Sequence, residues 1–204
     1  MAPLARTPIS KKWVFRQTTT LNSSCASSWL PVALFPTVAH IDLLHHKLIP
    51  DPYIDTNELD CLWVNDADFT YRTTFPSPSL PSNDSSRAEL VFDGLDTIVS
   101  VFFNSEKILE GRDMHLSYRV DVTRLLKKEG EENELELRFS NAPAYAKSEM
   151  KRIGYKGNGT DVHFGGPERL FVRKAQYHWG WDVSALCFSW SLKLLPLSIS
   201  YSWS

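Results

Sequence analysis

The sequence predicts an all-β fold: a jelly-roll β-sandwich with short helical connections and an irregular C-terminal tail. Several segments alternate apolar and polar residues, as a strand does when one face lies on a core and the other in water. No helix of crossover length separates these segments, which argues against a parallel sheet. With 204 residues, 43% of them hydrophobic and 23% charged, the chain is long enough to bury one core.

The strands are predicted from this alternation. One face of the first, residues 69–75, carries Phe69, Tyr71, Thr73 and Phe75. Residues 135–139 alternate in the same way. Segments 88–93 and 97–103 are rich in β-branched and aromatic residues, and we expect the second to be buried between two layers.

The connections follow from turn residues and short helical patterns. Asp93-Gly94 marks a turn, and Asn104-Ser105 before residues 107–109 predicts a hairpin, although the favoured Asn-Gly pair is absent. The Ser/Pro-rich residues 76–86 predict an exposed loop. Two short helices are expected, at 145–150 and at 38–46. One face of the second would carry Val38, Ile41 and either Leu44 or His45.

Composition and charge exclude several functional classes. A formal net charge of −2 gives no basic field, so no nucleic acid partner is expected. No apolar run reaches the roughly 18 residues of a membrane span and none resembles a secretory signal, so no membrane association and a cytoplasmic location are expected.

Metal and cofactor sites are not expected either. Cys25, Cys61 and Cys187 are too widely spaced for a zinc site or a disulfide framework, which indicates reduced, structural thiols. His45, His46, Cys61 and His163 likewise lack metal-ligand spacing, and no Gly-rich phosphate loop occurs.

Several blocks between about Trp13 and Asp182 stand out. Besides Trp63, they are Trp29-Leu-Pro-Val-Ala-Leu-Phe-Pro-Thr-Val-Ala-His40, Asp42-Leu-Leu44, Ile49-Pro-Asp-Pro-Tyr53, Tyr71-Arg-Thr-Thr-Phe75, Phe92-Asp-Gly-Leu-Asp-Thr97, Arg119-Val-Asp-Val-Thr123 and Val172-Arg-Lys-Ala-Gln-Tyr-His-Trp-Gly-Trp-Asp182. In these blocks the chain resembles the N-terminal domain of β-mannosidase-type family 2 glycoside hydrolases. The resemblance implies a galactose-binding-like sandwich. Of the blocks that carry it, the last is the most specific.

That last block suits a carbohydrate site. Indole faces cover the apolar C–H faces of a sugar ring, and a carboxylate accepts hydrogen bonds from its hydroxyls. The substrate-binding candidates are therefore Trp179, Trp181 and Asp182. The resemblance implies that Trp181 and Asp182 touch a terminal mannose at the rim of a barrel. The alternative is that these aromatic rings serve packing in the core or at an interface.

No catalytic residue is assigned in this chain. Retaining hydrolysis of a glycosidic bond uses two carboxyl groups about 5–5.5 Å apart, and the resemblance implies that both are glutamates of a barrel. Such a barrel takes about 250 residues, too many to fit here. Asp161, Glu168 and Asp182 lie near the aromatic motif, but no pattern supports them as substitutes. We therefore expect an inactive, non-catalytic domain that meets a β-mannoside only within a complete enzyme.

Three segments are expected: an N-terminal extension (1–12), the sandwich (13–182) and a tail (183–204) outside the resemblance. The tail has Lys193 as its only ionised side chain, and Val183-Ser184 is what an in-frame splice donor encodes. A retained intron or a frameshift is the hypothesis, and it predicts an unpaired sheet edge open to self-association. The alternative is a true terminus with a strand near 195–201. A stand-alone carbohydrate-binding module or an interaction sandwich is the alternative function.

Overall fold

The computed structural model describes residues 4–18, 28–80, 86–154, 166–179, 193–194 and 197–202. The strands are β1 (Leu4–Pro8), β2 (Val14–Gln17), β3 (Leu30–Pro31), β4 (Thr37–Val38), β5 (Phe69–Pro76), β6 (Arg87–Phe92), β7 (Leu95–Asp96), β8 (Ile98–Phe103), β9 (Glu106–Gly111), β10 (Tyr118–Asp121), β11 (Glu132–Ser140), β12 (Lys193–Leu194) and β13 (Leu197–Ser202). The α-helices are α1 (Ala39–His45), α2 (Asn57–Asp60) and α3 (Ala142–Ile153), and the 3₁₀ turns are η1 (Leu62–Asp66), η2 (Thr123–Leu125), η4 (Pro167–Phe171) and η5 (Gln176–Trp179).

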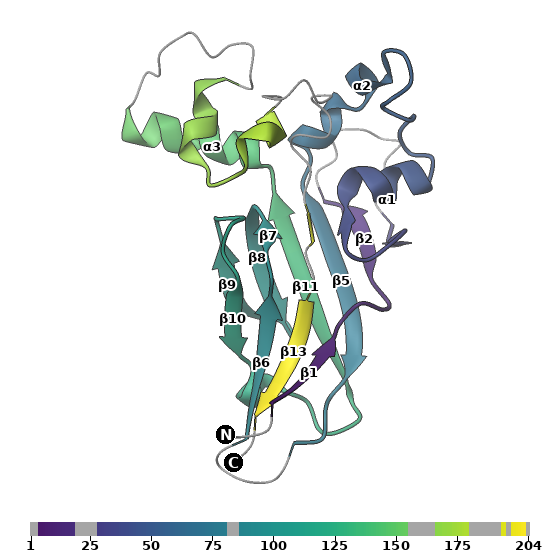
Figure 1. The fold of residues 1–204 in the computed structure, drawn as a ribbon, viewed down its shortest axis with the longest axis vertical. Helices are drawn as coiled ribbons and strands as arrows, with labels where there is room; N and C mark the ends of the chain where they lie inside the picture. Colours follow the sequence, from purple (N-terminus) through teal and green to yellow (C-terminus); the bar gives the residue numbers. More distant parts are fainter. Residues whose placement is uncertain are drawn as a thin grey trace.

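Two antiparallel sheets form the predicted sandwich. One has the strand order β1-β13-β6-β10 and the other β3-β2-β5-β11-β8-β9, while a small third sheet orders β4-β12-β7. The three α-helices gather at one end of the sandwich, and β1 and β13 lie side by side at the other (Figure 1). The all-β fold class is thereby confirmed.

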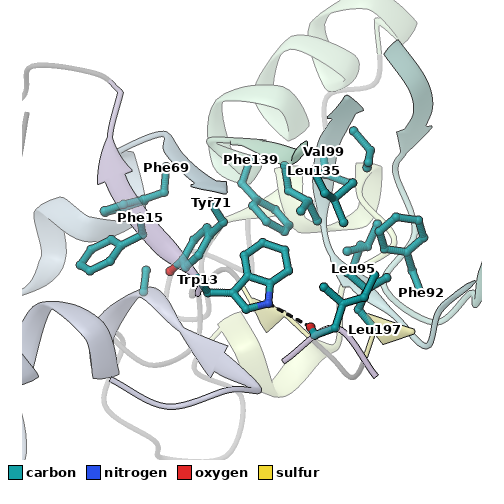
Figure 2. Close-up of a cluster of buried hydrophobic side chains, with 14 of the residues drawn as sticks. Trp13, Phe15, Phe69, Tyr71, Phe92, Leu95, Val99, Leu135, Phe139 and Leu197 are labelled. Atoms are coloured by element: carbon teal, nitrogen blue, oxygen red, sulfur yellow. Dashed lines mark hydrogen bonds between the residues drawn. The ribbon is translucent and has the colours of Figure 1, made fainter. Parts of the chain in front are cut away.

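The core fills the space between the two sheets. Leu90, Phe92, Leu197 and Ile199 enter it from the four-stranded sheet, and Phe69, Tyr71, Leu135, Leu137 and Phe139 enter it from the six-stranded sheet. Trp13 lies between them, and its indole Nε1 donates a hydrogen bond to the Ile9 carbonyl oxygen at 3.0 Å (Figure 2). The alternation that predicted the strands is therefore the alternation of core-facing and outward-facing side chains.

The strand predictions hold, with one correction. Segments 69–75, 88–93 and 135–139 coincide with β5, β6 and β11 to within a few residues. Residues 98–103 form β8, but they are not buried on both faces, because only Val99, Val101 and Phe103 enter the core. On the outer face, the Arg138 guanidinium lies 4.0 Å from the centroid of the Phe102 ring. A cation stacked on an aromatic face explains why an apolar strand can have one face outside the core.

The predicted hairpin joins β8 to β9 through Asn104 and Ser105, which have φ of 49° and 71°. Two successive residues with positive φ are typical of a type I′ turn. The Asn104 amide Nδ2 donates to the Leu125 carbonyl oxygen at 2.7 Å, and its Oδ1 accepts from the Glu134 amide at 2.9 Å. These bonds hold the asparagine in this conformation. Ser105 also has a positive φ, which strains the backbone of a residue that carries a Cβ atom.

Ser105→Gly is expected to stabilise the chain by about 0.5–1 kcal/mol. Glycine removes the Cβ strain at positive φ, and the entropy of the more flexible unfolded chain offsets part of that gain. Urea denaturation of the variant measures the difference. Lys128→Gly in the loop after η2 serves as the comparison, because it adds the same entropy cost without relieving strain at a positive φ. Equal loss of stability in both variants would contradict the prediction.

The helix expected at 38–46 is present as α1, but its buried face is not the predicted one. Ile41 and Leu44 are 43% and 37% exposed, while Ala39, His40, Asp42 and Leu43 are buried. Asp42 accepts hydrogen bonds from the Ala33 amide at 2.8 Å and from the Tyr71 hydroxyl at 3.1 Å. A buried carboxylate with two donors is satisfied, so apolar spacing alone pointed to the wrong face.

His40 makes the stability of this end of the sandwich depend on pH. Burial lowers the pKa of His40 from 6.5 to about 4. As the pH falls from 6.5 to 4 the unfolded chain binds a proton that the folded chain does not, so stability is lost in that window, by about 3 kcal/mol in total. Burial raises the pKa of Asp42, which acts in the opposite direction. The His40 contribution is therefore measured as a difference between two chains.

Urea denaturation of the wild type and of His40→Gln across this window isolates that contribution. Glutamine keeps a polar side chain but does not titrate between pH 7 and pH 4. The free energy of unfolding of the wild type is expected to fall more steeply than that of the variant, by about 3 kcal/mol between pH 7 and pH 4. Parallel curves would show that His40 is protonated normally in the folded chain.

The second expected helix, 145–150, is longer in the structure and runs over Ala142–Ile153 as α3. It begins at Asn141, whose Oδ1 accepts a hydrogen bond from the Ala144 amide at 2.7 Å, and Pro143 occupies its first turn. It ends at Gly154, which has a φ of 76°. An asparagine cap, an early proline and a C-terminal glycine are the ordinary boundary signals of a helix. They mark the residues of α3 that the predicted range 145–150 leaves out.

Both ends of the chain contribute strands to the four-stranded sheet. β13 pairs with β1 over Leu4–Pro8 on one side and with β6 on the other, and Leu197 and Ile199 are buried in the core. Residues 4–8, expected to belong to an extension, and residues 197–202, expected to belong to an irregular tail, are therefore parts of this sheet. The alternative, a true terminus with a C-terminal strand, therefore fits residues 197–202. The sheet edge that was expected to be unpaired is filled by β13, which lies beside β6.

Candidate functional site

The segment that contains the predicted motif runs along the end of the sandwich where the α-helices gather. η4 lies against α3, with Lys147 Nζ 3.7 Å from Glu168 Oε1, and η5 follows after four residues. In Figure 1 these two turns are the yellow-green ribbons beside α3. The described part of the motif therefore ends at Trp179, at this end of the sandwich.

Trp179 is a packing residue. Its side chain is 0% exposed and belongs to a small apolar cluster with Ala146 and Val172, against which Tyr145 and Ile98 pack. A fully buried indole offers no face to a ligand, so the structure favours the packing alternative for this ring. Its large side chain fixes the end of η5 against α3 and the start of β8.

The other two candidates, Trp181 and Asp182, lie outside the described residues, and so do Asp161, Cys25 and Cys187. The sugar-binding roles of Trp181 and Asp182 remain predictions. Cys61 is buried, and burial raises the pKa of its thiol, as suits a structural cysteine.

A buried ionic cluster of Asp96, Lys174 and His178 holds the motif segment to the sandwich. Lys174 Nζ donates to Asp96 Oδ1 at 2.7 Å, and the two side chains are 2% and 1% exposed. His178 Nδ1 lies 3.2 Å from the second carboxylate oxygen, Oδ2. Thr97 Oγ1 also donates to Oδ1. One carboxylate of β7 therefore contacts two positions of the motif segment, four residues apart.

Electrostatics favour the ionised form of the Asp96 carboxyl. Burial alone raises the pKa of Asp96, but Lys174, His178 and Thr97 together hold the pKa of this carboxyl below its usual value. Burial lowers the pKa of Lys174, and Asp96 opposes that change. With the ammonium and the carboxylate 2.7 Å apart, each charge is compensated by the other.

A second brace holds the same segment from the loop after β9. Asp113 forms a parallel bridge with Arg173, and its Oδ2 accepts from the Arg173 guanidinium at 3.2 Å. The Met114 amide donates to the Arg173 carbonyl oxygen at 3.0 Å. The backbone of the segment is thus fixed on one side by this loop and on the other by Asp96.

The motif pattern pointed to aromatic and acidic residues, and it missed Asp96, Lys174 and His178 as partners. Lys174 was not singled out. Asp96 and Lys174 do lie inside two of the blocks that carry the family resemblance, 92–97 and 172–182. The block gave no local signal that Lys174 is buried, because the neighbouring Arg173 is also cationic and its side chain is 75% exposed.

Within the described ranges no cluster of three or more histidine, cysteine or acidic side chains is arranged to hold a metal ion. The helices in those ranges are all too short or too polar to cross a bilayer.

Comparison with known proteins identifies relatives of this chain. The chain is 45% identical over 182 residues to "Beta-mannosidase B" of Thermothelomyces thermophilus, and the alignment covers 89% of this chain and 20% of the relative. It is 42% identical over 182 residues to "Beta-mannosidase B" of Aspergillus clavatus, covering 89% and 21%. The chain therefore spans about a fifth of the length of the curated relatives that it matches.

The fold has a counterpart among solved structures as well. The chain superposes on a β-D-mannosidase from Dictyoglomus thermophilum with a TM-score of 0.81 and 30% sequence identity, over 98% of this chain and 23% of that one. Residues 13–189 match the family model described as glycosyl hydrolase 2 galactose-binding domain-like. The match includes the block 172–182, all strands of the six-stranded sheet, and β6 and β10 of the four-stranded sheet, but not β1 or β13. The chain therefore belongs to the galactose-binding domain-like family of glycoside hydrolase family 2.

Proposed function

We propose that this domain supplies one edge of the mannose pocket of a β-mannosidase and performs no hydrolysis by itself. Trp181 would cover an apolar face of a terminal β-mannose unit, and Asp182 would accept hydrogen bonds from its hydroxyls. The two glutamates of a retaining hydrolase would come from a barrel that lies outside these 204 residues.

The observation that carries this proposal is the way the motif segment is held. The Asp96 carboxylate of β7 contacts Lys174 and His178 of the segment, and Trp179 anchors the end of η5. The chain then continues through one glycine to Trp181 and Asp182. A binding group is effective when its support is rigid, and this segment is supported on the side of the sandwich and on the side of α3.

The test is a chimera in which residues 13–182 replace the matching segment of the Thermothelomyces thermophilus relative. The 204-residue chain alone is expected to release no 4-nitrophenol from 4-nitrophenyl β-mannoside, whereas the chimera is expected to hydrolyse it. Asp182→Ala in the chimera is expected to lower kcat/KM by about 100-fold or more, because a charge-assisted hydrogen bond to the sugar is lost and its donor is left unpaired.

Asp161→Ala is the matched control, since it removes another acid near the motif and is expected to leave kcat/KM within about twofold. An unchanged kcat/KM in Asp182→Ala, in a chimera that is active and folded, would refute the role of Asp182. Release of 4-nitrophenol by the 204-residue chain itself would refute its assignment as a non-catalytic domain.

For the expected self-association through a sheet edge, we infer that β9 is not the strand that pairs with a second copy. β9 is one outer strand of the six-stranded sheet, and its Glu106, Lys107 and Glu110 side chains are exposed and charged. Charged outer strands resist pairing with a second copy. Sedimentation velocity at several concentrations distinguishes a monomer from an edge-paired dimer.

A further inference from the structure

We propose that a cavity at the open side of the sandwich binds a small amphipathic monocarboxylate, a ligand with an apolar body and a single carboxylate. The cavity lies between β1, β13 and the end of β5, which Figure 1 shows together at the end of the sandwich away from the α-helices. The motif segment lies at the other end, so this site is separate from the sugar site of the proposed function.

The cavity has the size and the wall of a small-molecule site. Its volume is about 420 Å³, and its apolar wall consists of Pro8, Ile9, Phe75, Pro76 and Ile199. Ile9 and Ile199 belong to the buried core, against which Phe75 packs. The cavity is therefore a place where the core is reached from the surface, and an apolar ligand body would leave water there.

The register of β1 on β13 explains why the core is open at this point. Thr7 lies opposite Ile199, so both side chains are on the inner face of the four-stranded sheet. Ile199 is buried, but Thr7 is exposed. Since β1 is an outer strand and Thr7 is small, the gap between β1 and β5 remains open.

Hydrogen bonds hold the rim of the cavity, which is the loop between β1 and β2. The Ile9 amide donates to the Leu197 carbonyl oxygen at 2.9 Å, and its own carbonyl oxygen accepts from the Trp13 indole at 3.0 Å. Thr73 Oγ1 donates to the Lys11 carbonyl oxygen at 2.7 Å. The rim is thus tied to both sheets, and a cavity held in this way needs little rearrangement when a ligand binds.

The charge at the cavity favours an anion. Lys11 and Lys12 line it, and none of the described lining residues is acidic. Lys12 Nζ lies 3.2 Å from Glu132 Oε1, so these two charges compensate each other. No ion pair involves Lys11 within the described ranges, which leaves one positive charge for a ligand with one negative charge.

Tyr201 adds a hydrogen-bond donor to the wall. Its side chain is partly buried, and burial raises the pKa of its hydroxyl to about 12. The hydroxyl therefore keeps its proton at neutral pH and can donate to a carboxylate oxygen. An apolar wall that also offers a cation and a hydroxyl donor matches the two parts of an amphipathic carboxylate.

The test is a titration of the 204-residue chain, ¹³C-labelled at the isoleucine δ1 methyl groups, with sodium octanoate at neutral pH. The methyl resonances of Ile9 and Ile199, assigned with Ile9→Val and Ile199→Val, are expected to shift with a Kd of about 0.1–1 mM. The methyl resonance of Ile49, a buried residue after α1, is expected to stay in place. Octylammonium, which has the same chain and the opposite charge, is expected to bind at least about fivefold more weakly.

Lys11→Glu tests the charge without changing the cavity wall. Octanoate is expected to bind this variant at least about fivefold more weakly than the wild type, and octylammonium is expected to bind it more tightly than octanoate does. Lys107→Glu is the matched control, because Lys107 is an exposed lysine of β9, on the far edge of the six-stranded sheet. Its Kd for octanoate is expected to stay within about twofold of the wild-type value.

Thr7→Trp tests the cavity itself, since an indole at this exposed position of an outer strand fills the gap toward β5. Octanoate is expected to shift neither the Ile9 nor the Ile199 methyl resonance in Thr7→Trp, whereas Thr7→Ser is expected to bind as the wild type does. If Thr7→Trp does not fold, the surface variant Lys11→Glu decides. Octanoate that leaves both wild-type resonances in place at 10 mM, or that binds wild type and Lys11→Glu equally, would overturn the proposal.

Discussion

A chain that ends at Leu194 is expected to lose cooperative folding. β13 lies between β1 and β6, so its removal leaves two strands with unpaired backbone groups and takes Leu197 and Ile199 out of the core. Loss of a buried aliphatic side chain costs about 2–5 kcal/mol, and two such losses together with a missing strand approach the 5–15 kcal/mol stability of a typical domain. Thermal unfolding followed by near-ultraviolet circular dichroism is the measurement.

Deletion of residues 203–204 is the control, because it shortens the chain and leaves β13 intact. This variant is expected to unfold with the midpoint of the full chain. Ile199→Ala, which keeps the strand but removes one core side chain, is expected to be destabilised by about 2–4 kcal/mol. If the chain ending at Leu194 unfolds as sharply as the full chain, the tail is dispensable and its strand contributes nothing to stability.

Lys174→Met alone is expected to destabilise the chain by about 3–5 kcal/mol. The replacement fills the space of the lysine stem but leaves the Asp96 carboxylate, which is 1% exposed, without its ammonium partner. Urea denaturation at neutral pH gives the free energy of unfolding for the wild type and the variant.

The single variant is compared with the double variant Asp96→Val/Lys174→Met. The double variant is expected to recover most of the unfolding free energy that Lys174→Met loses. A single replacement leaves an uncompensated buried charge, whereas the double replacement leaves none. Lys147→Met is the surface control, since the Lys147 side chain is 63% exposed and lies 3.7 Å from Glu168, and it is expected to change stability by less than about 0.5 kcal/mol. Equal losses in the single and double variants would show that the pair stabilises the fold by packing alone.

The sequence predicts the layers of this fold well, because side-chain alternation depends directly on which face of a strand meets the core. Residues 135–139 show this, since Leu135, Leu137 and Phe139 are buried and the positions between them are not. In 69–75 the agreement is close but incomplete, because Phe75 is half-buried and Thr70 on the other face is buried. The prediction failed where burial is decided by polar partners. In α1 the buried face includes His40 and Asp42, and the Tyr71 hydroxyl that satisfies Asp42 comes from a strand far along the chain. Apolar periodicity carries no information about such a partner.

The candidate site was predictable as a segment but not as a set of interactions. The aromatic motif singled out residues 177–182, and Trp179 then proved to be buried. The residues that support the segment, Asp96 and Lys174, are 78 positions apart in the chain. A contact of that kind depends on the register of β7 and on the path of the segment after η4. Neither follows from local sequence, so tertiary pairing had to be seen in the structure.

The pairing of β1 with β13 has a consequence for how the chain folds. Leu4 lies opposite Ser202 and Pro8 lies opposite Ser198, so this contact joins residues that are almost the full length of the chain apart. Closing so long a loop is entropically unfavourable, and chains dominated by such distant contacts fold slowly. Because β13 separates β1 from β6, the four-stranded sheet is complete only after residues 197–202 are available. During synthesis the six-stranded sheet, whose strands lie within residues 14–140, can assemble first, and the edge of β6 that pairs with β13 stays unpaired until residues 197–202 have been made.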